Sequence, residues 1–171
     1  AWPFIEWLVH VFWLHLDPVE LPRWRVGRVT LGGRFDPYVA RKHRAHHRDP
    51  WRLDHVMIPL HTYLYSVPLN LLFWFGLFEP PQALTGLTMV SALGLHYEVV
   101  HLLAHSRYRP RSRFYRRLWR NHRLHHCKSE KHWLGVTMLL GDRVLGTSGD
   151  PRAVPTSPTC RTLGQEETLG A

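Results

Sequence analysis

The chain has 171 residues and a net charge of +9, and this length is enough for one domain. Nine of its 22 basic residues lie in residues 23–52 and ten in residues 107–131, whereas residues 53–106 hold none. Such charge could bind nucleic acid, but no helix-turn-helix, zinc-finger or RNA-binding signature accompanies it, so we expect no nucleic-acid partner. The two cysteines, Cys127 and Cys160, are too few for a disulfide framework.

Residues 1–16 form a short apolar segment that ends in two histidines. We expect it to be the end of a longer spanning helix whose upstream part is missing from this chain. His10 and His15 are five residues apart, and an ideal α-helix does not align that spacing. The pair therefore predicts a π-bulge or a frayed helix end.

The first basic segment predicts a helix that carries the motif HxxHH. Asp36 and Pro37 suit an N-cap and a first helical turn, and Asp49-Pro50 suits its end. Residues three and four apart share one helix face, so His43, His46 and His47 should lie together.

The uncharged block predicts a membrane hairpin. Residues 56–78 and 83–105 are two apolar limbs, each close to the length of about 20 residues that a helix needs to cross a bilayer. Residues 79–82 (EPPQ) suit the turn between them. Both basic segments then fall on one side of the membrane. Because basic residues favour the cytoplasmic side, we expect that side to be the cytoplasm, where these loops meet anionic headgroups.

The second limb ends in the motif HxxxH, His101 and His105. Ser112 should cap a further helix with a second HxxHH, formed by His122, His125 and His126. Residues 148–171 are rich in Gly, Pro, Ser and Thr, and we expect a disordered tail there.

The predicted topology gathers the four clusters just beneath the bilayer surface. Ten neutral imidazoles can hold two metal ions with about five ligands each, and imidazole suits iron, zinc, copper and nickel. Spacing alone does not choose among these metals. The expected fold is therefore all-α, an integral-membrane helical bundle with a cytosolic, histidine-rich dinuclear metal cap.

The histidine clusters carry a resemblance to a known family. The sequences EWLVHVFWLH, KHRAHH, HYEVVHLLAH and NHRLHH, followed by WLGVT, resemble the fatty acid hydroxylase superfamily, which includes sterol desaturases and fatty acid hydroxylases. Carotene hydroxylases share a similar pattern. The resemblance covers about residues 4–147, and we take residues 1–147 as the membrane domain. By this resemblance, the metal ligands would be His10, His15, His43, His46, His47, His101, His105, His122, His125 and His126.

The resemblance implies a membrane-bound, non-haem di-iron oxygenase that hydroxylates or desaturates a lipid. It would use two iron ions (zinc is possible in the isolated protein), dioxygen and electrons from a small acidic carrier of the cytochrome or ferredoxin type. Without a G-x-G-x-x-G motif or a P-loop, the chain should not bind its own nicotinamide cofactor. A basic surface suited to the carrier is offered by Arg113, Arg116, Arg117 and Arg120.

Three further residues are candidates for orienting the ligands. Glu98 lies one helical turn before His101, Glu6 lies four residues before His10, and His96 lies five before His101. Either carboxylate could instead be an ordinary interfacial group.

Two non-enzymatic functions compete with the oxygenase. One is a membrane metal-binding or metal-transport protein, although transporters place their ligands near the bilayer midplane. The other is a structural zinc site, which needs only four ligands per ion.

Overall fold

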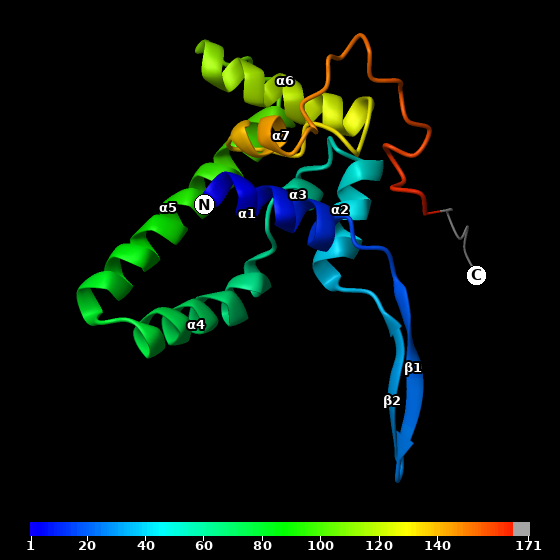
Figure 1. The fold of residues 1–171 in the computed structure, drawn as a ribbon, viewed down its shortest axis with the longest axis vertical. Helices are drawn as coiled ribbons and strands as arrows, with labels where there is room; N and C mark the ends of the chain where they lie inside the picture. The colour runs from blue at the N-terminus through cyan, green and yellow to red at the C-terminus, as the bar shows by residue number, and fades with distance from the viewer. Residues whose placement is uncertain (166–171) are drawn as a thin grey trace.

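The computed structural model describes residues 1–165, which form helices and one β-hairpin (Figure 1). The elements in chain order are α1 (Trp2–Val9), the π-helix η1 (His10–Leu14), β1 (Val19–Val26), β2 (Val29–Phe35), α2 (Tyr38–Arg48), α3 (Leu53–Val56), α4 (Leu60–Leu77), α5 (Pro80–Ala104), α6 (Arg113–Cys127) and α7 (Leu140–Val144). The mostly helical fold agrees with the sequence analysis.

Helices α4 and α5 form the hairpin predicted for the uncharged block (Figure 1). Two stretches, Leu53–Leu77 and Pro80–Ala104, are long and apolar enough to cross a membrane. Their connection is shorter than predicted because Pro80 and Pro81 occupy the first turn of α5, where a missing N–H costs nothing. Gly86 allows the two helices to approach, since a Cβ there would lie 2.3 Å from the Trp74 ring.

The π-helix η1 aligns the first histidine pair. The His15 backbone N–H donates to the His10 carbonyl at 3.1 Å, a bond between residues five apart. This confirms the π-bulge that the spacing predicts, because a wider turn brings residues i and i+5 onto one face.

An antiparallel β-hairpin separates η1 from α2, so the all-α prediction is wrong at this segment. Val26 pairs with Val29, which leaves Gly27 and Arg28 as a two-residue loop with Gly27 at a φ of +62°. Alternating apolar residues on both sides of a Gly-containing turn are a hairpin signal that the sequence analysis did not use.

Arg44 ties both ends of this hairpin to α2. Its guanidinium donates to the Leu16 carbonyl, which precedes β1, at 2.7 Å, and to the Asp36 carboxylate, which follows β2, at 2.5 Å. The predicted cap of α2 is therefore wrong, because Asp36 pairs with Arg44 and makes no side-chain cap. By contrast, Ser112 does cap α6, accepting from the Tyr115 N–H at 3.2 Å.

The segment that follows α6 packs against the helices that carry the histidines. Trp133 is buried and donates its indole N–H to the Gly149 carbonyl at 3.1 Å. Residues 148–165 lie in turns, where the Ser157 N–H donates to the Lys128 carbonyl at 2.7 Å. The sequence predicts a disordered tail over residues 148–171; within residues 148–165 the chain forms turns and loops in which Val154 and Cys160 are buried, and residues 166–171 lie outside the described part.

The buried position of Arg44 predicts a large effect of its removal. Arg44→Met should lower the free energy of unfolding by about 3 kcal/mol, because the Asp36 carboxylate loses its buried partner. Thermal unfolding in detergent measures the change. The control is Arg52→Met, whose ion pair with Asp54 is mostly exposed and should cost less than about 1 kcal/mol. Equal effects of the two changes would contradict the anchoring role.

Candidate metal centre

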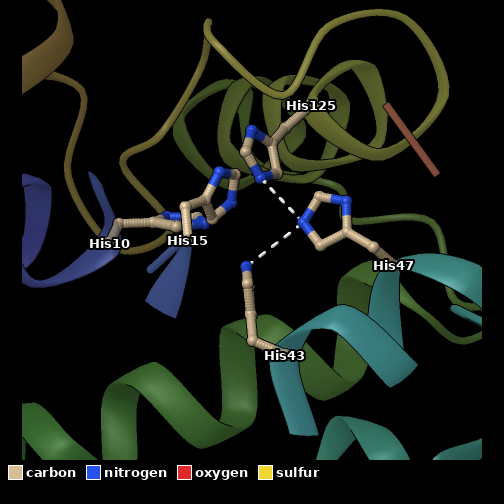
Figure 2. Close-up of side chains that lie close together, drawn as sticks. All are labelled: His10, His15, His43, His47 and His125. Atoms are coloured by element: carbon tan, nitrogen blue, oxygen red, sulfur yellow. Dashed lines mark hydrogen bonds between the residues drawn. The ribbon is translucent and has the colours of Figure 1, made fainter. Parts of the chain in front are cut away.

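All ten predicted ligands come together in two groups of five. Within each group the possible ligand atoms all lie within 4.8 Å of one another. The first group, shown in Figure 2, is His10, His15, His43, His47 and His125. The second group is His46, His101, His105, His122 and His126. Nine of the ten side chains are buried, and His15 is half-buried.

Each HxxHH helix supplies both groups. In α2, His43 and His47 are one turn apart and enter the first group, whereas His46 enters the second. In α6 the roles are exchanged: His122 and His126 enter the second group. Because neighbouring helical residues are rotated by about 100°, a His-His dipeptide must direct its rings differently. The motif thus divides its three imidazoles between two adjacent sites.

The inner nitrogens are spaced as ligands of one ion would be. In the first group, the Nε2 atom of His47 lies 3.1 Å from those of His43 and His125 (Figure 2). At a metal–nitrogen distance of about 2.1 Å, ligands at right angles lie about 3.0 Å apart, and tetrahedral ones about 3.4 Å. The observed spacing fits adjacent ligands of a five- or six-coordinate ion.

The second group has the same spacing. The Nε2 atoms of His101 and His46 are 3.0 Å apart, and those of His105 and His122 are 2.8 Å apart. His126 completes the group at 3.1 Å from His122. Each group therefore fits one metal ion.

Backbone carbonyls orient three rings of the first group through the opposite ring nitrogen, Nδ1. The donor and acceptor pairs are His10 to Leu134 at 2.5 Å, His47 to Cys160 at 2.7 Å, and His125 to His132 at 3.0 Å. A carbonyl only accepts, so Nδ1 carries the proton and Nε2 keeps its lone pair facing the site.

Burial keeps these imidazoles neutral. It lowers the pKa of His47 to about 3, although the hydrogen bond to the Cys160 carbonyl opposes the shift. Burial also holds the pKa of His125 well below 6.5, and the nearby rings of His10 and His47 lower it further. At neutral pH the lone pairs are therefore available to a cation.

The three residues expected to orient the ligands lie elsewhere. Glu98 is buried but accepts from the Ile58 N–H at 3.1 Å, and Glu6 accepts from the N–H and hydroxyl of Thr137 at 2.9 and 3.0 Å. The ring of His96 lies 3.4 Å from the Tyr115 hydroxyl. Within residues 1–165, none of the three is hydrogen-bonded to any of the ten imidazoles.

A carboxylate that the sequence analysis missed performs the supporting role. Asp142 is fully buried and accepts from the N–H groups of Leu134 and Gly135, both at 2.8 Å, and from the Thr147 hydroxyl at 2.6 Å. It thereby fixes the Leu134 peptide, whose carbonyl orients His10. The only hint of this role in the sequence is that Asp142 closely follows the segment WLGVT.

A mainly apolar cavity of about 340 Å³ reaches both groups. Its wall includes His10 and His43 of the first group and His46 and His101 of the second. The remainder comes from α1, η1, α2, α3, residues 57–59, the start of α4 and the middle of α5, where Gly94 leaves open space. A molecule in this cavity would lie against both histidine groups.

A second cavity of about 750 Å³ lies beside His105. Arg107, Arg109 and Arg123 line it together with Trp51 and Trp119. Its basic wall adjoins α6, so positive charge surrounds this approach to the second group.

The helices carry two buried groups of five imidazoles that could each hold a metal ion, beside an apolar cavity, and two of the helices are long and apolar enough to cross a membrane. The fatty acid hydroxylase family model matches residues 1–147, so the chain belongs to that family. Membership implies an oxygenase-type oxidoreductase that acts on lipids through a histidine-rich metal site. Searches of curated proteins and of solved structures found no significant match.

The division into two groups predicts independent losses of metal. Purified protein should hold two ions per chain, whereas His43→Ala/His47→Ala and His122→Ala/His126→Ala should each hold about one, because each change removes two of five ligands from one group. Elemental analysis of the purified variants measures this. His96→Ala serves as the control and should keep both ions. Loss of both ions in either double variant would contradict two separable sites.

Proposed function

We propose that the chain is a membrane-bound, non-haem di-iron oxygenase that hydroxylates or desaturates a lipid. The observation that carries this proposal is the apolar cavity whose wall contains histidines of both five-imidazole groups. An apolar substrate held there would lie beside both ions at once.

The ligand sets favour iron over structural zinc. A structural zinc ion takes four tetrahedral ligands, whereas each group here offers five imidazoles, and the Nε2 atoms that pair within a group lie 2.8–3.1 Å apart. Imidazole is a suitable ligand for iron. When bound, a pair of iron ions would supply the redox chemistry with dioxygen that side chains lack.

The chain's own residues position the reactants and exclude water. Backbone carbonyls fix the rings of His10, His47 and His125, and Asp142 fixes the loop that supplies one of those carbonyls. The apolar cavity wall provides few hydrogen-bonding partners, so it selects an aliphatic chain over a polar molecule. Burial of the site also limits access of bulk water.

We also propose that α4 and α5 span the membrane with the histidine groups on the cytoplasmic face. The exposed surface of α4 is rich in Leu and Phe and that of α5 in Leu, Val and Met, which suits contact with lipid. Only His101 of the ten histidines lies within a candidate span. A position at the end of the span favours an oxygenase over a transporter.

Electrons would come from an acidic carrier that docks on the basic surface of α6. Arg113, Arg116, Arg117 and Arg120 are all exposed there, and the basic cavity beside His105 adjoins them. Positive charge on this face would steer a negatively charged protein toward the second histidine group.

The cavity predicts that a side chain at Gly94 blocks the substrate. In cells that express the protein, an oxygenated or desaturated lipid should be present with the wild type, absent with His125→Ala, and reduced at least several-fold with Gly94→Leu. Lipid profiling by mass spectrometry measures this. The matched control is Gly76→Leu, since Gly76 also faces open space but lies outside the cavity.

Metal content separates the two variants. Gly94→Leu should keep both ions, because the position touches no imidazole nitrogen, whereas His125→Ala should lose one. Identical lipid profiles for wild type and His125→Ala, with the protein present in the membrane, would contradict catalysis. Metal uptake by sealed vesicles without dioxygen consumption would favour the transport function.

The docking proposal predicts a salt dependence. Turnover with a reduced acidic carrier should fall as ionic strength rises, and Arg116→Glu/Arg117→Glu should raise the KM for the carrier several-fold with little change in kcat. The rate with a small uncharged reductant should be unaffected. Turnover with the acidic carrier that is indifferent to salt would exclude this docking surface.

A further inference from the structure

The β-hairpin carries a continuous apolar face. Pairing partners in a hairpin point to the same side, and the pairs Val19–Phe35, Trp24–Leu31 and Val26–Val29 are all apolar. With Leu21, the face has seven large side chains, each 42–69% exposed: Val19, Leu21, Trp24, Val26, Val29, Leu31 and Phe35.

A β-bulge keeps this face continuous. Leu21 and Trp24 are three residues apart and would point to opposite sides of a regular strand. The register shifts between them, so that two residues of β1 oppose Gly32 alone. Only glycine fits at position 32, because its φ is +92° and a Cβ would lie 2.0 Å from the Pro22 carbonyl oxygen.

The other side of the hairpin is basic. The pairs Glu20–Arg34 and Arg25–Thr30 lie on it, and Arg28 occupies the turn. With Arg23, the hairpin has four arginines against one acidic residue. An apolar face bordered by arginines is the pattern of an element that lies at the surface of an anionic membrane.

The hairpin is a fixed arm of the molecule. Figure 1 shows β1 and β2 projecting from the helices, and the described helices do not pack along their length. At the base of the arm, Arg44 of α2 binds the residues that precede β1 and follow β2. Arg44 lies in the sequence between His43 and His46. The direction of the apolar face is therefore set by the same helix that carries the metal ligands.

Lipid suits this face better than a second copy of the chain. Two copies meeting through their hairpins would bring together two sets of four arginines with only one acidic residue in each hairpin. An anionic bilayer surface offers both an apolar layer and phosphates, and the candidate spans α4 and α5 would place one beside the protein.

We propose that the apolar face of the β1–β2 hairpin lies in the headgroup region of an anionic bilayer, with its arginines reaching the lipid phosphates. The hairpin is then a second membrane contact, in addition to α4 and α5. Through Arg44 it holds α2 and its histidines at a set depth below the lipid. This contact does not require metal or catalysis, so it can be tested on metal-free protein.

The test compares two neighbouring positions on opposite faces. Trp24→Cys and Arg25→Cys, each in a Cys127→Ser/Cys160→Ser background, are labelled with an environment-sensitive fluorophore. Each is placed in nanodiscs that hold one copy of the full chain. The lipids are phosphatidylcholine with brominated acyl chains, with or without phosphatidylserine. We expect blue-shifted emission and several-fold stronger bromine quenching at position 24 than at position 25.

Phosphatidylserine tests the charge. It should increase quenching at position 24 about two-fold, and Arg23→Glu/Arg28→Glu should remove this increase. Equal quenching with and without phosphatidylserine would overturn the preference for anionic lipid.

Two further results would overturn the membrane contact itself. Equal quenching at positions 24 and 25 would mean that the hairpin does not turn its apolar face toward the lipid. A blue shift at position 24 without quenching would mean that protein covers the face. Energy transfer between labels in discs that hold two copies would then identify that protein as a second chain.

Discussion

The structure depends on burying ten imidazoles next to one another. Desolvation lowers their pKa values, so they remain neutral, and carbonyls that accept from Nδ1 direct the Nε2 lone pairs inward. Nitrogen lone pairs facing each other at about 3 Å repel unless a cation lies between them. The arrangement is therefore explained if each group of five imidazoles binds one metal ion. Much of the surrounding chain holds the rings in place.

Two charged residues far apart in sequence provide most of that support. Asp142, after α6, orders the loop that orients His10, and Arg44 joins the start and end of the β-hairpin to α2. Asp142 and Arg44 are both buried, so a charge left without its partner at either position would cost stability. The centre thus relies on a few polar contacts more than on a large apolar core, which here consists of small clusters such as Val100, Leu118 and Val136.

The apolar surface of the molecule falls into two parts, the cavity wall and the outer faces of α4, α5 and the β-hairpin. The cavity beside both histidine groups faces inward and suits an aliphatic substrate. The outer sides of α4 and α5 and one face of the β-hairpin point away from the body and suit lipid.

The sequence by itself predicted the ten histidines that cluster, the helices that carry them, the π-turn at His10 and the candidate spans. These features follow from local periodicity: spacings of three, four and five residues fix which side chains share a helical face. It did not determine which histidines share an ion, because that depends on how α2 and α6 face each other. It also led to wrong expectations for Asp36 and for the hairpin, and to three ligand-orienting candidates, Glu6, Glu98 and His96, whose hydrogen bonds in the described residues go to other groups. The groups that do orient them are backbone carbonyls from residues up to 124 positions away, and only tertiary folding brings these into reach because a carbonyl has no signature in sequence.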